Sequence, residues 1–350
     1  MPELAVLTEQ LLAPVPGGTG RHTRELTAAL AANTPDGWIV AGVTARHGDT
    51  TAAAIPGVPT RALKLPRRAL ALAWERGLPP RVRTDSLHAP TPLAPDGAVI
   101  TIHDTVPYTH PETLTPRGVA WHRRMITRAV HRAAAIVVPT HAVARDLEKH
   151  APGPVEVHVI GNGVTPLPLA PDPDAVAARL DLPREYVLAI GTVEPRKGLD
   201  TLVDAIPAVG LPLVVAGPRG WGDVDLQALA RRSGATVHVL GRVDDAELGV
   251  ALRRAAALAV PSRAEGFGLP LLEAMAEGVP VAHSDAPALV EVAAGTGVAH
   301  RRADLDDLAR ALREALKREH VDRARERAAG FTWQRAAERV WSLHRRLAEQ

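Results

Sequence analysis

Two glutamates on either side of a glycine-rich turn are the residues of this chain best suited to chemistry. Glu265 comes directly before the turn Gly266-Phe267-Gly268, and Glu273 follows in a predicted helix that opens at Leu269. The apolar run 257–260 predicts a buried strand leading into this turn. Pro270 is expected at the first helical position, where its missing N–H has no structural cost. The segment is therefore predicted to present a helix N-terminus between two carboxylates, with Glu273 in the first turn.

A helix N-terminus suits phosphate, because it carries about half a positive charge and exposes free N–H groups. Carboxylates repel phosphate but accept hydrogen bonds from pairs of sugar hydroxyls. A glycosyl nucleotide presents both kinds of group. We therefore predict a nucleotide-sugar site that includes Glu265, Gly266, Phe267, Gly268, Leu269 and Glu273. The alternative is that the two glutamates only complement the helix dipole at the surface.

A second segment supplies positive charge. Arg196 and Lys197 lie in the run Gly191-Thr-Val-Glu-Pro-Arg-Lys-Gly198, after a strand predicted over 186–190. Cations of this kind can neutralise a diphosphate, and an arginine can bind it through two parallel hydrogen bonds. The alternative is an ordinary exposed pair in a loop.

Two further candidates lie in the first half of the chain. Gly17-Gly18-Thr19-Gly20 follows the first predicted strand, and consecutive glycines let a backbone approach a ligand closely. The spacing does not match the dinucleotide-binding fingerprint, because Thr23 stands where its last glycine should be. His103 and Asp104 end a strand predicted over 98–103, where the histidine could donate to a sugar hydroxyl or move a proton and the aspartate could orient it. A structural histidine is the alternative.

Composition excludes several classes of protein. The chain of 350 residues contains no cysteine, which removes disulfides, zinc–cysteine sites and thiol nucleophiles. A formal net charge of +2 is too small for a general nucleic-acid binder. The N-terminus lacks the basic start and apolar stretch of a signal peptide, and no apolar run approaches a membrane span, so we expect a cytoplasmic protein.

Positive charge is concentrated between Arg61 and Arg83. Around the apolar stretch 69–74 this segment has one acid, Glu75, and seven cations: Arg61, Lys64, Arg67, Arg68, Arg76, Arg81 and Arg83. This pattern fits peripheral contact with an anionic membrane surface. A solvated helix in an arginine-rich chain is the alternative.

Apolar runs alternate with helical segments along the whole chain, which is typical of parallel sheets with crossover helices. The alternation is interrupted once, at the proline-rich segment 163–173, which we interpret as a linker. We predict an α/β protein with two Rossmann-like doubly wound domains, residues 1–167 and 168–350. Such an arrangement places the C-terminal ends of two sets of strands across a cleft.

The segment from 257 to 282 resembles the E-x7-E signature of the retaining glycosyltransferases of family 4, the group 1 glycosyltransferases. The segment 186–202 is similar to the strand, loop and helix that open the family's C-terminal domain, with one departure: Thr192 stands where many members have arginine. The glycine-rich loop at Gly17 and the pair His103-Asp104 also resemble family segments.

The resemblance implies a GT-B fold, with acceptor bound by the first domain and sugar nucleotide by the second. It also implies that the last helix packs back on the first domain. Glu265 would contact the donor sugar and Glu273 the ribose, while Gly17, Gly18, Thr192, Arg196 and Lys197 would face the diphosphate. His103 and Asp104 would lie in the interdomain cleft. The expected reaction moves a hexosyl group, mannose being favoured by the form of 191–197, to a hydroxyl of a glycan, glycolipid or small molecule, with retention.

Some of the same residues would also fit other functions. A glycosidase could use Glu265 and Glu273 as its carboxylate pair, but the helix end and the two cations favour a leaving diphosphate. A metal-dependent transferase would need an Asp-x-Asp motif; Asp304-Leu-Asp306 has that spacing but is expected to cap a helix. We therefore expect no metal and no cofactor. A non-catalytic sugar-nucleotide-binding subunit and a GT-B epimerase or hydrolase stay open.

Overall fold

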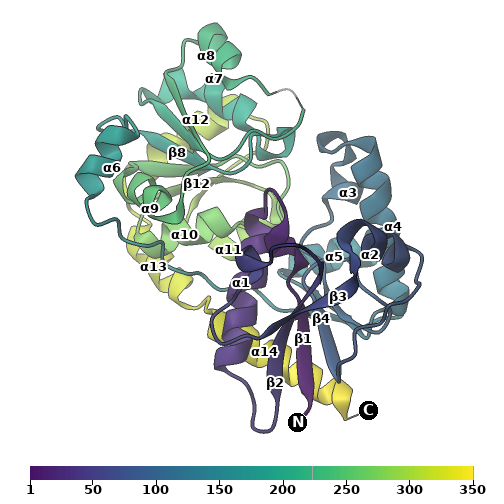
Figure 1. Ribbon diagram of the computed structural model, residues 1–350. Helices are drawn as coiled ribbons and strands as arrows, with labels where there is room; N and C mark the ends of the chain where they lie inside the picture. The colour runs from purple at the N-terminus through teal and green to yellow at the C-terminus, as the bar shows by residue number, and fades with distance from the viewer. Residues whose placement is uncertain (223, 350) are drawn as a thin grey trace. The chain divides into compact units, whose positions relative to one another are not determined.

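The chain forms two compact units in a computed structural model that describes residues 1–222 and 224–349. The first unit comprises residues 1–108, 116–163 and the C-terminal segment from Phe331. The second comprises residues 109–115 and 164–330. Residue 350, with which the predicted second domain ends, lies outside the described residues. Each unit is described separately below (Figure 1).

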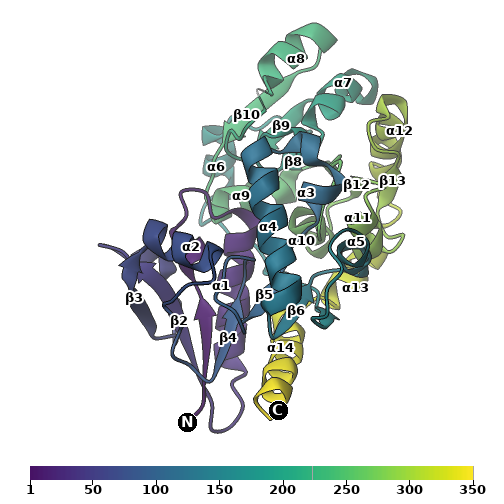
Figure 2. The same cartoon turned by 90° about the vertical axis from the view of Figure 1, so that its right-hand side faces the viewer.

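The first unit is built on a seven-stranded parallel sheet with the order β3-β2-β1-β4-β5-β6-β7. Its strands are β1 Glu3–Leu7, β2 Ile39–Arg46, β3 Thr60–Pro66, β4 Ser86–Ala89, β5 Val99–Thr101, β6 Ala135–Val138 and β7 Val157–Val159. Strand β3 lies at one edge of the sheet (Figure 2). The central strand β1 is buried on both faces, as expected for a sheet covered by helices on both sides.

Helices cover both faces of this sheet. The unit contains α1 Gly17–Ala32, α2 Arg67–Glu75, α4 Pro116–Arg132, α5 His141–His150, α14 Trp333–Ala348 and the short α3 Val106–Thr109 and η1 Glu9–Leu12. On one face, Ala5 and Leu7 of β1 belong to a core that includes apolar residues of α2, α4 and α5. On the other face, Leu4 and Val6 share a core with α1 and α14.

The C-terminal helix α14 is anchored to the first unit by polar as well as apolar contacts. Trp341 Nε1 donates to the Leu30 carbonyl of α1 at 3.0 Å. His344 lies 3.1 Å from His88 of β4, joined through Nε2 and Nδ1, and both rings are fully buried. Burial lowers the pKa of both histidines, that of His344 to about 3, so the rings are neutral at physiological pH.

The second unit has a six-stranded parallel sheet with the order β10-β9-β8-β11-β12-β13. Its strands are β8 Val187–Ile190, β9 Leu213–Ala216, β10 Val237–Gly241, β11 Ala257–Val260, β12 Val281–Ser284 and β13 Val298–His300. Its helices are α6 Pro173–Arg179, η4 Pro195–Lys197, α7 Leu199–Val209, α8 Leu226–Ser233, α9 Asp245–Arg254, α10 Leu269–Glu277, α11 Pro287–Ala293, α12 Leu305–Ala315 and α13 Val321–Ala329. Helices α7, α8 and α12 share one core with the sheet.

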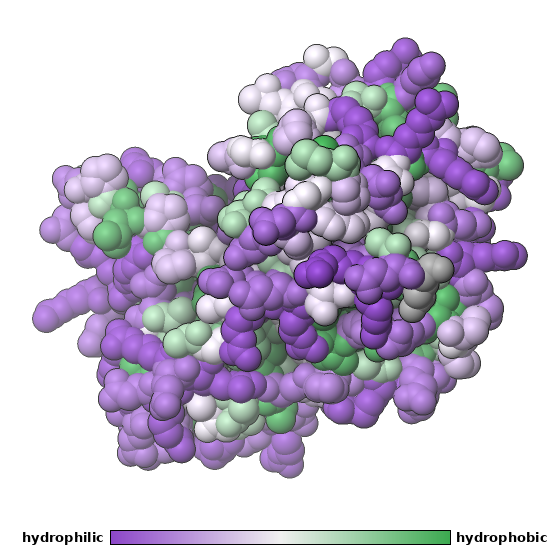
Figure 3. All heavy atoms as spheres, turned by 90° about the horizontal axis from the view of Figure 1, so that it is seen from below, coloured by the Kyte–Doolittle hydropathy of each residue, from purple (hydrophilic) through white to green (hydrophobic). Residues whose placement is uncertain are grey.

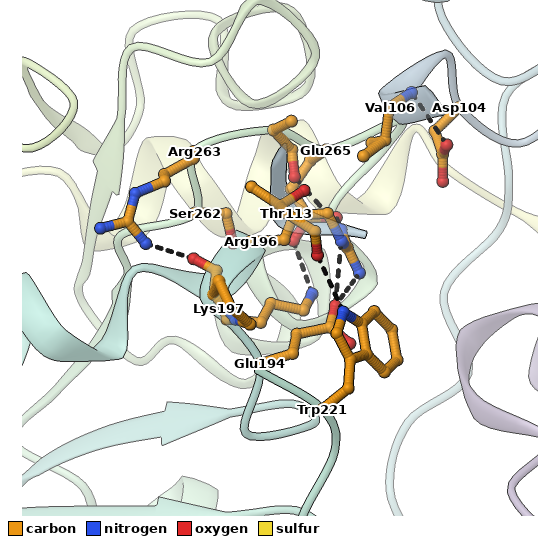
Figure 4. A network of polar contacts seen from close by, with 12 residues as sticks. Asp104, Val106, Thr113, Glu194, Arg196, Lys197, Trp221, Ser262, Arg263 and Glu265 are labelled. Atoms are coloured by element: carbon orange, nitrogen blue, oxygen red, sulfur yellow. Dashed lines mark hydrogen bonds and ion pairs between the residues drawn. The ribbon is translucent and has the colours of Figure 1, made fainter. Parts of the chain in front are cut away.

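Residues 109–115 come from the first half of the chain but group with the second unit. They include η3, Pro111–Thr113, and the Thr113 carbonyl accepts a hydrogen bond of 2.8 Å from Trp221 Nε1 (Figure 4). This segment shows that sequence order alone does not define the two units.

The predicted α/β class with two Rossmann-like parallel-sheet units is confirmed. Several elements were not predicted, namely β3, β4, β13, α6 and α11. Strand β5 ends at Thr101, so it does not extend to His103 as predicted. The basic segment forms β3 and α2, and α2 is solvated on only one side, because Leu70 and Trp74 are each 4% exposed in the core.

Among the described residues, no helix combines the length and apolar character needed to cross a membrane. On the face drawn in Figure 3, hydrophilic side chains predominate and hydrophobic ones are scattered among them in small groups.

Candidate functional site

The two cations predicted to bind phosphate lie in a turn that follows a central strand of the second unit. Strand β8 runs into Gly191 and then into the η4 turn, which carries Arg196 and Lys197. Gly191 has φ +146°, and a Cβ built on it would lie 3.2 Å from Lys197 Cε. A side chain here would therefore displace the lysine stem. Thr192 follows Gly191 at the C-terminal end of the strand.

The loop that carries Glu265 lies beside this turn, because β8 and β11 are neighbours in the sheet. Parallel neighbours end at the same edge, which brings the loops after them together. The approach is closest at Gly198, the N-cap of α7, which has φ +64°. A Cβ there would lie 2.2 Å from the Pro261 carbonyl oxygen, so only glycine permits this contact.

Glu265 joins the two loops (Figure 4). Its Oε1 lies 2.6 Å from Lys197 Nζ and accepts from the Ser262 hydroxyl at 2.8 Å. Its Oε2 accepts from Arg196 Nη1 at 3.0 Å. On its other side, Arg196 Nη2 pairs with Glu194 Oε1 at 2.8 Å. Two carboxylates and two cations thus form a network with no net charge.

Electrostatics keep Glu265 ionised. Burial disfavours its charged form, but the nearby Lys197 and Arg196 outweigh that effect, and the pKa falls to about 2. For Glu194 the balance differs: burial raises its pKa, although Arg196 and Lys197 act in the opposite direction and Glu265 adds to the rise. The network therefore presents a fixed carboxylate at Glu265 throughout the physiological pH range.

Glu273 is not in the first turn of its helix. Helix α10 begins at Leu269 and Glu273 is its fifth residue, so Pro270 is the second helical residue rather than the first. The Glu273 side chain is not at the surface, since the residue is only 5% exposed. These findings correct the predicted positions and argue against a surface role in complementing the helix dipole.

The turn between the two glutamates is tightly packed. Phe267 is 5% exposed, and Gly268, the N-cap of α10, has φ +94°. A Cβ on Gly268 would lie 2.4 Å from Leu289 Cδ2, so the turn requires glycine for both backbone and space. Gly266 lies between Glu265 and Phe267. The predicted strand, turn and helix order is therefore present, with a helix N-terminus just beyond Glu265.

In the first unit, the glycine-rich segment is not a loop. Gly17 and Gly18 are the first two residues of α1, and η1 lies between β1 and this helix. The helix begins at Gly17, so the glycines are part of its first turn. These glycines therefore lie at a helix N-terminus, the kind of structure that binds anions.

His103 and Asp104 lie just beyond β5, both half-buried. His103 Nε2 lies 2.8 Å from the Pro90 carbonyl oxygen, which can only accept, so this nitrogen carries the proton. Burial lowers the pKa of His103, although the Pro90 bond and Asp104 act against the shift. The neutral ring therefore offers Nδ1 as an acceptor. Asp104 Oδ1 accepts from the Val106 N–H at 3.1 Å.

A cavity of about 530 Å³ opens beside His103 and Asp104 within the first unit. Helix α2 lines it with Arg67, Trp74 and Glu75, and α4 contributes Trp121 and His122. Trp121 Nε1 donates to Glu75 Oε1 at 2.8 Å, which fixes the indole in the wall. Indole faces and carboxylate oxygens are groups that suit a hydroxyl-rich molecule.

Several residues near the predicted site received no role from the sequence. Glu194 and Ser262 complete the Glu265 network, and His22 lies edge-to-face with His103 at 4.7 Å between ring centroids. Glu194 lies two residues before Arg196 in the run 191–198, and this proximity could have suggested that it takes part in the site. The contact between His22 and His103 depends on how α1 packs in the first unit, and no local sequence pattern predicts it.

Among residues 1–222 and 224–349, no cluster of three or more histidine or acidic side chains is arranged to hold a metal ion. Asp304 accepts from the Asp307 N–H as the N-cap of α12, which confirms its predicted capping role. Thr140 caps α5 in the same way, by accepting from the Val143 N–H.

Two family descriptions match the chain. Residues 16–166 match "Glycosyltransferase Family 4" and residues 174–331 match "Glycosyl transferases group 1". The two segments follow one another in sequence and together include all the candidate site residues described above.

Curated relatives match part of the chain. O-antigen chain mannosyltransferase B of Escherichia coli is 32% identical over 46% of this chain and 46% of its own length. A phosphatidyl-myo-inositol mannosyltransferase of Mycobacterium leprae is 33% identical over 65% of this chain and 61% of its own length. The matched part of this chain thus spans about half the length of such relatives.

Solved structures match over nearly the whole chain. Sucrose-phosphate synthase from Thermosynechococcus elongatus has a TM-score of 0.76 at 23% identity and covers 99% of both chains. The Anabaena protein HepE, in complex with UDP and glucose, has a TM-score of 0.73 at 17% identity and covers 98% of this chain and 99% of its own. These likenesses establish the GT-B fold. The two matched segments, which together span most of the chain, show that it belongs to the group 1, family 4 glycosyltransferases, and its curated relatives include mannosyltransferases.

Proposed function

We propose that this glycosyltransferase moves a hexosyl group from a nucleoside-diphosphate sugar to a hydroxyl acceptor, with retention of anomeric configuration. One observation carries the proposal. Arg196 and Lys197 converge on the ionised Glu265 just before the N-terminus of α10, so donors for phosphate and an acceptor for sugar hydroxyls lie together. This is the combination that a sugar nucleotide requires.

On the donor side, the two cations and the end of α10 would hold the diphosphate. Lysine has three N–H donors, and Glu265 engages one of them at 2.6 Å, which leaves capacity for a phosphate oxygen. Glu265 would accept from hydroxyls of the donor sugar, and the buried Glu273 from the ribose. Gly17, Gly18 and Thr192 would supply backbone or hydroxyl contacts to the same diphosphate.

Retention without a protein nucleophile fits a same-face displacement. The bond from the anomeric carbon to the phosphate oxygen breaks, and the acceptor oxygen forms its bond on the same face. The acceptor proton passes to the departing phosphate. The ionised Glu265 would stabilise the positive charge that develops on the sugar ring. His103, whose Nε2–H is held by Pro90, would accept a hydrogen bond from a substrate hydroxyl at Nδ1 and would keep no proton from the transfer.

The acceptor would enter the cavity of the first unit beside His103 and present a hydroxyl of a glycan, glycolipid or small molecule. Mannose is the donor sugar we favour, because the relatives with matching segments include mannosyltransferases. We place the reaction in the cytoplasm, in cell-surface glycan synthesis, and propose that it needs no metal ion, since cations and a helix end supply the positive charge.

The basic segment would hold the enzyme at the inner face of a membrane. Leu72 and Leu78 are 50% and 54% exposed, and the same segment of sequence contains five exposed cations: Lys64, Arg68, Arg76, Arg81 and Arg83. The inner side of α2 lines the cavity, so a lipid-linked acceptor could be bound next to the surface that holds it.

Transfer itself is tested by incubating the protein with panels of nucleoside-diphosphate sugars and hydroxyl acceptors in excess EDTA. We expect full turnover under these conditions. Proton NMR of the product should show the same anomeric configuration, axial or equatorial, as the donor sugar. An inverted product would contradict retention, and activity that only magnesium or manganese restores would contradict metal independence. Hydrolysis or epimerisation of the donor without transfer would instead favour those alternatives.

The roles of Glu265 and Glu273 are distinguished by replacing each with glutamine. Glu273→Gln should weaken binding of the free nucleoside diphosphate about tenfold, because a neutral acceptor replaces an ionised one. Glu265→Gln should leave that affinity equal or tighter, since it removes a negative charge beside Lys197, yet it should depress transfer. Calorimetry and initial rates measure the two effects. Equal losses of nucleotide affinity in both variants would show that the carboxylates are assigned wrongly.

Membrane contact is tested by sedimentation with vesicles of phosphatidylglycerol or of phosphatidylcholine. The double variant Arg68→Ala, Arg76→Ala should lose about tenfold or more of its affinity for the anionic vesicles, since each basic residue near such a surface contributes roughly 1 kcal/mol. Arg231→Ala, Arg232→Ala, on exposed positions of α8, is the control. Equal binding to both lipids by the unmodified protein would contradict the proposal.

A further inference from the structure

One side chain, Arg263, fastens the two loops of the donor site to each other. It lies between Ser262 and Glu265 in the loop after β11, and its guanidinium points away from Glu265 toward the η4 turn (Figure 4). There Nη1 donates to the Pro195 carbonyl, and Nη2 pairs with Asp200 Oδ2 of α7 at 2.7 Å. The Arg263 guanidinium thus binds both the η4 turn, through Nη1, and helix α7, through Nη2.

The backbone of Arg263 adds two further bonds. Its N–H donates to the Arg196 carbonyl at 2.8 Å, and its own carbonyl accepts from Arg302 Nη1 at 3.2 Å. Arg302 is in turn paired with Asp285 at 2.7 Å. The loops that follow β8, β11, β12 and β13 are therefore linked at this residue.

These bonds hold in place the two loops that carry the Lys197–Glu265 ion pair. The η4 turn is only three residues long and carries Lys197 directly after Arg196, so a shift of its carbonyls also moves the ammonium. Glu265 is two residues beyond Arg263. A planar guanidinium can bind a carbonyl and a carboxylate at once with fixed geometry, which a lysine ammonium cannot reproduce.

We infer that Arg263 is a positioning residue that sets the placement of Lys197 against Glu265. It acts through the turn rather than on the donor. The consequence for catalysis rests on the proposed function, whereas the consequence for Lys197 does not.

The chain offers a direct readout and a matched control. It has four lysines, so the reactivity of Lys197 toward an amine-acylating reagent can be followed by mass spectrometry, with the exposed Lys64 and Lys149 as internal references. Arg310 pairs with Asp307 at 2.7 Å and donates to the Ala299 carbonyl at 3.0 Å. Arg310→Ala therefore removes the same two kinds of contact elsewhere in the second unit.

In the unmodified protein Lys197 is protected, because its side chain is 15% exposed and is held by Glu265. Arg263→Ala should raise its acylation rate relative to Lys64 about tenfold, comparable to the loss of one charge-assisted bond. Arg263→Lys should give an intermediate acylation rate of Lys197. Arg310→Ala should leave that rate unchanged. Asp200→Asn provides a milder variant, with a smaller rise in the same direction, should Arg263→Ala fail to fold.

Transfer kinetics complete the test. A misplacement of about 1 Å can reduce catalysis about 100-fold, so Arg263→Ala should lower kcat by roughly 10- to 100-fold while the folded fraction matches that of Arg310→Ala. The acid limb of its pH profile should move to higher pH, because the pKa of Glu265 rises when Lys197 withdraws.

The possible failures are distinguishable. If the unmodified protein transfers no sugar but Lys197 becomes reactive in Arg263→Ala, the proposed function fails and the positioning role stands. If the reactivity of Lys197 is unchanged in Arg263→Ala and Asp200→Asn, the inference is overturned, whatever happens to transfer.

Discussion

The ion pair between Lys197 and Glu265 is the interaction around which the candidate donor site is organised. Both side chains are largely buried, and burying either charge alone would be strongly unfavourable. Each charge therefore stabilises the other, and Arg196 adds a second cation beside Glu265. Arg196 and Glu194 extend the alternation of charge, so the four side chains balance one another with no ligand bound. Such a network can exchange a partner at low electrostatic cost when an anionic donor arrives.

This pairing depends on the order of strands in the second sheet. Strands β8 and β11 are far apart in sequence but adjacent in space, and the loops after them meet at the carboxyl edge of the sheet. Gly198 allows their backbones to approach, and Gly268 turns the chain into α10. Arg263 then holds the two loops at a fixed separation. The Lys197–Glu265 pair thus forms because the strand order brings the two loops together, the glycines let them approach closely, and Arg263 bridges them.

Much of this could be predicted from residue patterns, because apolar β-branched runs mark buried central strands. The bounds of β11 match the strand predicted over 257–260, and Glu265, Arg196 and Lys197 do lie together. Edge strand β3 was missed because its residues alternate between exposed and half-buried and include cations. The depth of Glu273, the proton on His103 Nε2 and the bonds of Arg263 depend on contacts between distant segments, which leave no local signal in the sequence.

The central claim is that Lys197, held by Glu265, meets the diphosphate of the donor. The most direct measurement is calorimetric titration of Lys197→Ala with nucleoside diphosphate, beside Lys317→Ala, which removes a lysine paired with Glu314 at the same distance of 2.6 Å on the surface. Losing a charge-assisted contact of about 1.5–3 kcal/mol should weaken binding by Lys197→Ala roughly 10- to 150-fold and leave Lys317→Ala unchanged. Unchanged affinity in a folded Lys197→Ala protein would contradict the account.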